Sequence, residues 1–242
     1  MTLPQRMRAT ALQLPARFGA AKEQLTFAEA LLEGGPQTDL VLLPEAALTG
    51  YVSPRGNFDL SAFAEPIDGP TRAALAHLAK RFDCLVVGPV IERAGPGLFN
   101  SLLAITPVGE TLLHYRKHRP WVPEKWATPG PGPSDVISWR GKTITAAICF
   151  DVHTLSADAG PKLDAADLLL FPSAWVDDDE GDSRPELLTA ISAQHRVAVL
   201  NANWGPGKPL LNGQGGSLFL DAAGEVKARL KTKTGRLDVT LP

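Results

Sequence analysis

Residues 99–117 read FNSLLAITPVGETLLHYRK, two mainly apolar runs on either side of Pro107-Val108-Gly109-Glu110. Turn-forming residues between two strand-like runs predict a β-hairpin, with strands over Phe99–Thr106 and Thr111–Lys117. Hairpins join antiparallel strands, so a sheet that contains this one is not purely parallel. The residues before this stretch follow the pattern of a parallel sheet. The hairpin therefore decides between a purely parallel sheet and a mixed one.

The residues that precede the hairpin alternate between strand and helix patterns. We predict strands over Met7–Leu14, Asp39–Leu43 and Cys84–Val90, the last of which is a continuous apolar run typical of burial on both faces. Amphipathic helices are predicted between them, over Ala21–Leu32 and Thr71–Arg81. This order of elements is typical of βαβ units.

The residues that follow the hairpin repeat the same mixture of hairpins and βαβ order. Lys117–Pro133, with five prolines and two glycines, is predicted to be a long ordered loop or lid. Beyond it we predict these elements: a hairpin of Asp135–Trp139 and Thr143–Cys149, a strand Asp167–Phe171, a helix Pro185–Arg196, a strand Val197–Asn203, and a hairpin of Ser217–Leu220 and Glu225–Leu230. The mixture predicts a layered α/β fold with a mixed sheet, or with two sheets packed face to face.

Composition and charge narrow the class of protein. The chain has 242 residues, with 24 Lys and Arg against 26 Asp and Glu and a formal net charge of −2. Domains of about 100–200 residues are usual and larger α/β domains occur, so we expect residues 1–242 to form one domain. The balanced charge does not favour binding to nucleic acid, and no apolar run approaches the roughly 18 residues of a membrane span. Two cysteines cannot form a disulfide framework, and we expect a cytoplasmic location.

Three residues at the ends of predicted strands form a candidate catalytic group. Cys149 ends an apolar strand, Glu45 follows the buried run that ends in Leu43-Pro44, and Lys117 closes the hairpin. Taken singly, each has an ordinary explanation: a small core residue, a solvated carboxylate and a surface lysine. Together they suit acyl transfer, in which a thiolate attacks a carbonyl, a carboxylate moves protons and an ammonium stabilises the oxyanion. Cys84, inside an apolar strand, is predicted to be a core residue.

These residues lie in stretches that resemble the signature of the nitrilase, or carbon–nitrogen hydrolase, superfamily, whose members have a Glu–Lys–Cys triad. The three signature stretches and three further matches, in the order of the family, are residues 42–51 (LLPEAALTGY), 114–117 (HYRK), 147–151 (AICFD), 171–175 (FPSAW), 203–205 (NWG) and 215–217 (GGS). The resemblance implies an αββα sandwich of two mixed β-sheets flanked by helices, one carbon–nitrogen hydrolase domain over the chain, and assembly as a homodimer or higher homo-oligomer.

The resemblance also implies a reaction. Cys149 would attack the carbonyl carbon, Glu45 would move protons, and Lys117 with the backbone N–H of Phe150 would hold the oxyanion. A small linear carboxamide would be hydrolysed through a cysteine thioester, releasing ammonia, with no cofactor. Members of the family carry a second glutamate near the lysine, and Glu124 matches it after a shift of one residue. The loop after Lys117 is most similar to the aliphatic amidase and formamidase branch.

Candidates for the substrate pocket follow from the same stretches. They are Tyr51, Trp121, Trp126, His153 and Trp175, the tryptophans being either pocket walls or core residues. His153 lies four residues after Cys149, so a Cys/His pair is conceivable, but the family uses no histidine base and a pocket wall is the preferred interpretation.

Metal binding is not expected. The five histidines lack the spacing of metal ligands, and the acidic run 177–180 lacks the alternating pattern of a calcium loop.

Departures from the family pattern leave the substrate open. After the cysteine, relatives commonly have an arginine and then Phe-Pro-Glu, where residues 152–156 read VHTLS, so an ion pair at the pocket floor is missing. Relatives tend to have Glu-Asn where this chain has Gln194-His195. Hydrolysis of N-carbamoyl compounds or of nitriles by the same triad is an alternative. A catalytically impaired homologue that binds a small molecule is another.

Overall fold

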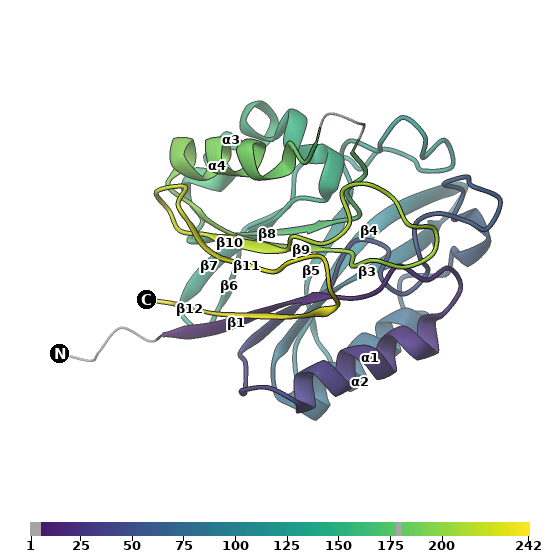
Figure 1. Cartoon of the computed structure of the whole chain (residues 1–242), viewed down its shortest axis with the longest axis horizontal. Coiled ribbons are helices and arrows are strands. Elements are labelled where there is room, and N and C mark those ends of the chain that lie inside the picture. The colour runs from purple at the N-terminus through teal and green to yellow at the C-terminus, as the bar shows by residue number, and fades with distance from the viewer. Residues whose placement is uncertain (1–5, 178–180) are drawn as a thin grey trace.

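Two six-stranded β-sheets lie face to face, and a pair of helices covers the outer face of each (Figure 1). The computed structural model describes residues 6–177 and 181–242. Most of the acidic run 177–180 lies outside the described residues. The layer order is αββα, which confirms the predicted fold class.

The first sheet is mixed. Its strands, in spatial order, are β12 (Gly235–Leu241), β1 (Met7–Gln13), β2 (Leu40–Leu42), β3 (Leu85–Ala94), β4 (Gly97–Ile105) and β5 (Thr111–Arg116). Strands β1, β2 and β3 are parallel, whereas β4 is antiparallel to both β3 and β5. Because the direction reverses twice between β3 and β5, the carboxyl ends of β2 and β5 lie at the same edge of the sheet.

The second sheet has the same plan. Its strands, in spatial order, are β11 (Val226–Arg229), β10 (Leu218–Leu220), β9 (Ala198–Asn203), β8 (Leu168–Ser173), β7 (Lys142–Ala146) and β6 (Ile137–Trp139). Strands β7, β8 and β9 are parallel, and the strands outside them are antiparallel to their neighbours. Each sheet thus has three adjacent parallel strands, and α/β proteins bind ligands beyond the carboxyl ends of such strands.

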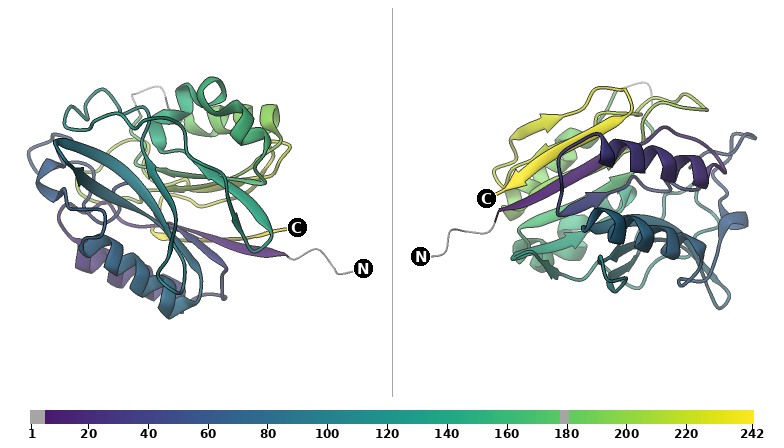
Figure 2. Two further views of the ribbon diagram at one scale, coloured as in Figure 1. Left: turned by 180° about the vertical axis from the view of Figure 1, so that it is seen from behind. Right: turned by 90° about the horizontal axis from the view of Figure 1, so that it is seen from below.

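Four α-helices and two short 3₁₀ helices complete the fold over the described residues. They are α1 (Ala21–Glu33), α2 (Pro70–Phe82), α3 (Leu155–Asp164), α4 (Arg184–His195), η1 (Ser61–Phe63) and η2 (Cys149–His153). Helices α1 and α2 lie side by side over the first sheet, and α3 and α4 pack together over the second (Figures 1 and 2). Over the described part of the chain, no helix is both long and apolar enough to cross a membrane.

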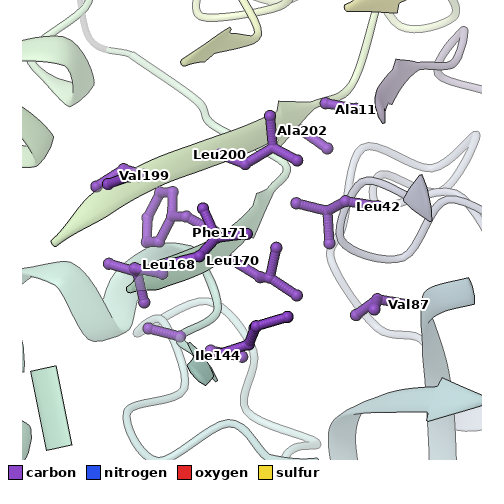
Figure 3. Close-up of a cluster of buried hydrophobic side chains, with 14 of the residues drawn as sticks. Ala11, Leu42, Val87, Ile144, Leu168, Leu170, Phe171, Val199, Leu200 and Ala202 are labelled. Carbon is purple, nitrogen blue, oxygen red and sulfur yellow. The ribbon is translucent and has the colours of Figure 1, made fainter. Parts of the chain in front are cut away.

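The main core lies between the sheets. Figure 3 shows Ala11, Leu42 and Val87 of the first sheet facing side chains of β7, β8 and β9, such as Leu170 and Leu200. Alternate residues of a strand point to opposite faces, so Val41 packs instead in a second core beneath α1 and α2. Burial on both faces explains the continuous apolar runs of these strands.

Helix α3 and strand β12 are not among the predicted elements. Helix α3 contains Gly160 and Pro161, two residues that disfavour a helix interior, yet it forms because its apolar side packs against the second sheet. Strand β12 alternates apolar Leu237, Val239 and Leu241 with polar residues, and it pairs along the whole of β1, from Met7 opposite Leu241. Strands β3 and β4 also form a hairpin of their own, so the strand predicted to begin at Phe99 begins two residues earlier.

Candidate active site

The candidate catalytic residues lie where corresponding edges of the two sheets come together. Glu45 and Lys117 follow β2 and β5 of the first sheet, whereas Cys149 and Ala174 follow β7 and β8 of the second. Sharp turns carry the chain away from the sheets at these points, because Ala46 and Cys149 both adopt the left-handed conformation, with φ of 49° and 45°. Non-glycine residues rarely adopt this conformation, and such strain often marks functional sites.

Lys117 lies between two carboxylates. Its Nζ atom is 2.7 Å from Glu45 Oε1 and 2.6 Å from Glu124 Oε2, and all three side chains are fully buried. Burial opposes a charge on Lys117, but the two carboxylates outweigh it and raise the pKa of the lysine above its ordinary value. Lys117 is therefore an ammonium. Glu124, which matches the second glutamate of the family only after a shift of one residue, thus lies beside Lys117.

Asn100 is a further member of this group that the sequence interpretation did not include. Its Nδ2 donates to Glu45 Oε1 and to Glu124 Oε1, at 2.8 Å each. Asn100 belongs to β4 and is fully surrounded by protein. An asparagine inside an apolar strand was the signal available in the sequence, because a buried amide must find hydrogen-bond partners.

The surroundings of Cys149 disfavour its thiolate form. Burial and the charge of Glu45 raise its pKa well above the ordinary value, while Lys117 and a hydrogen bond from the Ala174 N–H act in the opposite direction. The same Ala174 N–H donates to Glu45 Oε2 at 2.9 Å. The thiol and the carboxylate thus approach one backbone amide, and the thiol needs a base to become a nucleophile.

Asp151 holds the turn that carries Cys149. Its Oδ2 accepts hydrogen bonds from the Tyr115 hydroxyl at 2.7 Å and from the Ile148 N–H at 2.8 Å, and its Oδ1 accepts from the Arg119 N–H at 2.7 Å. Burial raises the pKa of Asp151 to about 6. One carboxylate thereby joins β5, the loop after Lys117 and the nucleophile turn.

Phe150 places a backbone donor next to the nucleophile. The first hydrogen bond of η2 runs from the Asp151 N–H to Ile148 O, at 3.0 Å. The N–H of Phe150 precedes this bond and has no acceptor within the helix. It is therefore a backbone donor adjacent to Cys149 that the helix itself does not use.

The segment from Lys117 to Pro133 forms a long loop without helix or strand. Its far end returns to β5, where the Gly130 N–H donates to Lys117 O at 2.8 Å. Only glycine fits at this point, because a Cβ atom on Gly130 would lie 2.1 Å from Arg116 O. The loop carries Glu124, whose Oε2 also accepts the Trp121 N–H at 2.7 Å.

A small cavity of about 80 Å³ opens onto Cys149. It is lined by Tyr51, Trp121, Cys149, Phe150, His153, Ala174, Trp175 and Val176. Three larger hollows, of about 830, 1060 and 710 Å³, are lined by none of the triad residues, so size alone does not mark the site.

Four of the five predicted pocket residues line this cavity. The fifth, Trp126, is not among the residues that line it: it packs in a cluster of apolar residues, and its Nε1 donates to Phe58 O at 2.7 Å. Other histidines have structural partners, such as His195 with Asp164 at 2.8 Å. Residues 6–177 and 181–242 contain no group of three or more His, Cys, Asp or Glu that could hold a metal ion.

Comparison with known proteins places these residues in a wider context. The model of a family described as carbon–nitrogen hydrolase matches residues 8–241. The chain is 28% identical over 222 residues to an (R)-stereoselective amidase from Pseudomonas sp., covering 91% of this chain and 79% of the relative. It is 28% identical over 246 residues to the omega-amidase YafV from Yersinia enterocolitica, covering 97% and 90%.

A similar solved structure is a Glu-to-Gln mutant of the amidase from Nesterenkonia sp. AN1, which shows the result of Michael addition of acrylamide at the active-site cysteine. The TM-score is 0.81 at 27% sequence identity, and the match covers 98% of this chain and 93% of that one.

Proposed function

Since the chain belongs to the carbon–nitrogen hydrolase family and is thus a hydrolase of C–N bonds, we propose that it hydrolyses a small linear carboxamide and releases ammonia. The convergence of Cys149 and Glu45 on the Ala174 N–H, beside the Lys117 ammonium, is the observation that carries this proposal. Relatives named as amidases, and a structural neighbour with acrylamide at its cysteine, favour an amide over other C–N bonds.

The first half of the reaction forms a thioester. Glu45 takes the proton of the Cys149 thiol as the sulfur attacks the carbonyl carbon, so the S–C bond forms and the π electrons of the carbonyl move to its oxygen. Lys117 donates two of its three N–H bonds to Glu45 and Glu124, which leaves the third for the oxyanion, together with the N–H of Phe150. The C–N bond then breaks, and the proton held by Glu45 goes to the leaving nitrogen as ammonia.

The second half releases the acid. Glu45 takes a proton from water, the resulting hydroxide attacks the thioester carbon, and the S–C bond breaks. The sulfur leaves as a thiolate, and the proton on Glu45 returns to it. Glu124 and Asn100 do not touch the reacting atoms in this scheme. They hold Lys117 and Glu45 in place through the hydrogen bonds described above.

A substrate panel with mass detection tests the proposal. The protein is incubated with acetamide, propionamide, an N-carbamoyl amino acid and an aliphatic nitrile, ammonia is measured, and acid-quenched samples are weighed intact. We expect ammonia from the amides and a protein mass increased by the acyl group. Turnover of the carbamoyl compound or the nitrile but of neither amide would contradict an amidase. A complete absence of turnover would favour a binding protein.

A further inference from the structure

The cavity at Cys149 is lined by uncharged groups. Its described lining residues include no Lys, Arg, Asp or Glu. The charges beneath it, on Glu45, Lys117 and Glu124, are fully buried and already paired with one another. Residues 1–5 and 178–180, outside the described ranges, read MTLPQ and DDE and contain no lysine or arginine. The described lining thus offers no permanent cation to a carboxylate on the substrate.

His153 is the one described lining side chain that could become a cation at moderate pH. Its ring packs between Phe150 and Trp175, with centroids 4.7 Å and 6.1 Å away, and part of it is exposed at the mouth of the cavity. Burial lowers the pKa of His153 below its ordinary value of 6.5, so the ring is neutral at neutral pH. Burial also raises the pKa of the Tyr51 hydroxyl, which is therefore neutral as well.

We propose that this cavity, whose described lining has His153 and no permanent cation, is selective for short, uncharged carboxamides and against amides whose acyl chain ends in a carboxylate. The inference rests on the proposed amidase function and names its substrate class. A carboxylate that enters the cavity loses water and gains no partner of opposite charge, which costs several kcal/mol. The volume of about 80 Å³ adds a limit on length, because cavities for drug-sized ligands measure roughly 300–1,000 Å³.

Malonamide and malonamate test the selectivity of the native protein, because they have the same length and differ by one charge. We expect propionamide and malonamide to be hydrolysed, and kcat/KM for malonamate to be lower than for malonamide by about tenfold or more. Equal or faster turnover of malonamate would overturn the inference and leave the amidase intact. Turnover of propionamide with neither diacid derivative would also overturn it, since the proposal admits an uncharged group of that size. No turnover of any amide would instead contradict the proposed function.

Substitution of His153 tests whether the lack of a permanent cation at this position sets the selectivity. His153→Arg and His153→Lys place a permanent cation at the mouth of the cavity, whereas His153→Gln keeps a polar, uncharged side chain. We expect both cationic variants to raise the malonamate-to-malonamide ratio of kcat/KM by about tenfold, and the Gln variant to keep the native ratio. Because the side chain is partly exposed, circular dichroism should show native folding in all three. An unchanged ratio in folded cationic variants would assign the selectivity elsewhere.

Discussion

The Ala174 backbone N–H, at the end of β8, donates a 2.9 Å hydrogen bond to Oε2 of Glu45, which follows β2 of the opposite sheet. Oε1 of the same carboxylate lies 2.7 Å from Lys117 Nζ. One side chain therefore joins the two sheets and holds the ammonium. Substitutions of Cys149, Glu45 and Glu124 should therefore affect activity in different ways, which separates the role of each residue.

Replacement of Cys149 by Ala should abolish amide hydrolysis, by about 10⁴-fold or more, because no other group at the site can form the thioester. The fold should persist, since the change removes one sulfur atom and no charge. Ammonia release and thermal melting measure the two effects. Cys84→Ala, a change at the other buried cysteine, is the matched control and should keep native activity. A Cys149→Ala protein within tenfold of native activity would refute the nucleophile.

Replacement of Glu45 by Gln should make Cys149 easier to alkylate while stopping turnover. The charge of Glu45 raises the pKa of the thiol, so its removal leaves Lys117 to favour the thiolate. Hydrolysis should nevertheless fall by about 10³-fold, because the general base is lost. Iodoacetamide labelling at pH 7 and ammonia release provide the two measurements. Glu110→Gln, at an exposed position, should change neither. Slower labelling of the Glu45 variant would contradict the account.

Replacement of Glu124 by Gln should lower kcat with little effect on KM. The Gln side chain keeps one oxygen and has an NH₂ group in place of the other. That NH₂ group must face hydrogen-bond donors that bind Glu124 in the native protein, either the Asn100 amide or Lys117 and the Trp121 N–H. Because Lys117 then loses its fixed position, we expect kcat to fall by about 10- to 100-fold. Steady-state kinetics on propionamide test this. A rise in KM at constant kcat would instead indicate that Glu124 contacts the substrate.

Acid should weaken the protein partly through Glu92, a buried carboxylate on β3. Burial alone would raise its pKa, but hydrogen bonds from His114, Arg116 and Ser101 lower it from 4.5 to about 2. A pKa lowered by folding stabilises the protein above pH 4.5, and this contribution is lost as pH falls toward 2. The loss amounts to roughly 3 kcal/mol.

Urea unfolding at pH 6 and pH 3 measures this contribution. Glu92→Gln should be less stable than the native chain at pH 6, and the difference between the two proteins should shrink at pH 3. Glu110→Gln should behave as the native protein at both values. A difference that stays constant with pH would show that Glu92 stabilises by packing alone.

The sequence predicts the triad because each member directly follows a recognisable strand. That strand ends meet at one edge of a sheet accounts for Glu45 and Lys117, whereas Cys149 joins them only because the second sheet packs face to face on the first. The contact of Glu124 with Lys117 was beyond that rule, because Glu124 lies in an irregular loop whose path depends on tertiary contacts such as that of Gly130. For the same reason the position of Trp126, in the same loop, could not be read from the sequence, and it lies in a cluster beside the cavity lining.

The parts of the fold that the sequence misses form through contacts distant in the chain. Strand β12 pairs with β1, more than 200 residues away, so its place at the edge of the first sheet depends on a distant partner although Leu237, Val239 and Leu241 show a strand pattern. Helix α3 is stabilised by burial against the second sheet despite Gly160 and Pro161. Local propensity is a weak guide where tertiary burial supplies most of the stability.

The division of the site between two sheets makes activity a measure of folding cooperativity. A partly folded chain that kept only the first sheet would hold the glutamates and the lysine without a nucleophile, and one that kept only the second would hold a thiol without a base. Neither half could turn over an amide. During denaturation, hydrolysis should therefore be lost before the two sheets separate or at the same time. Hydrolysis thus reports that both sheets are packed together.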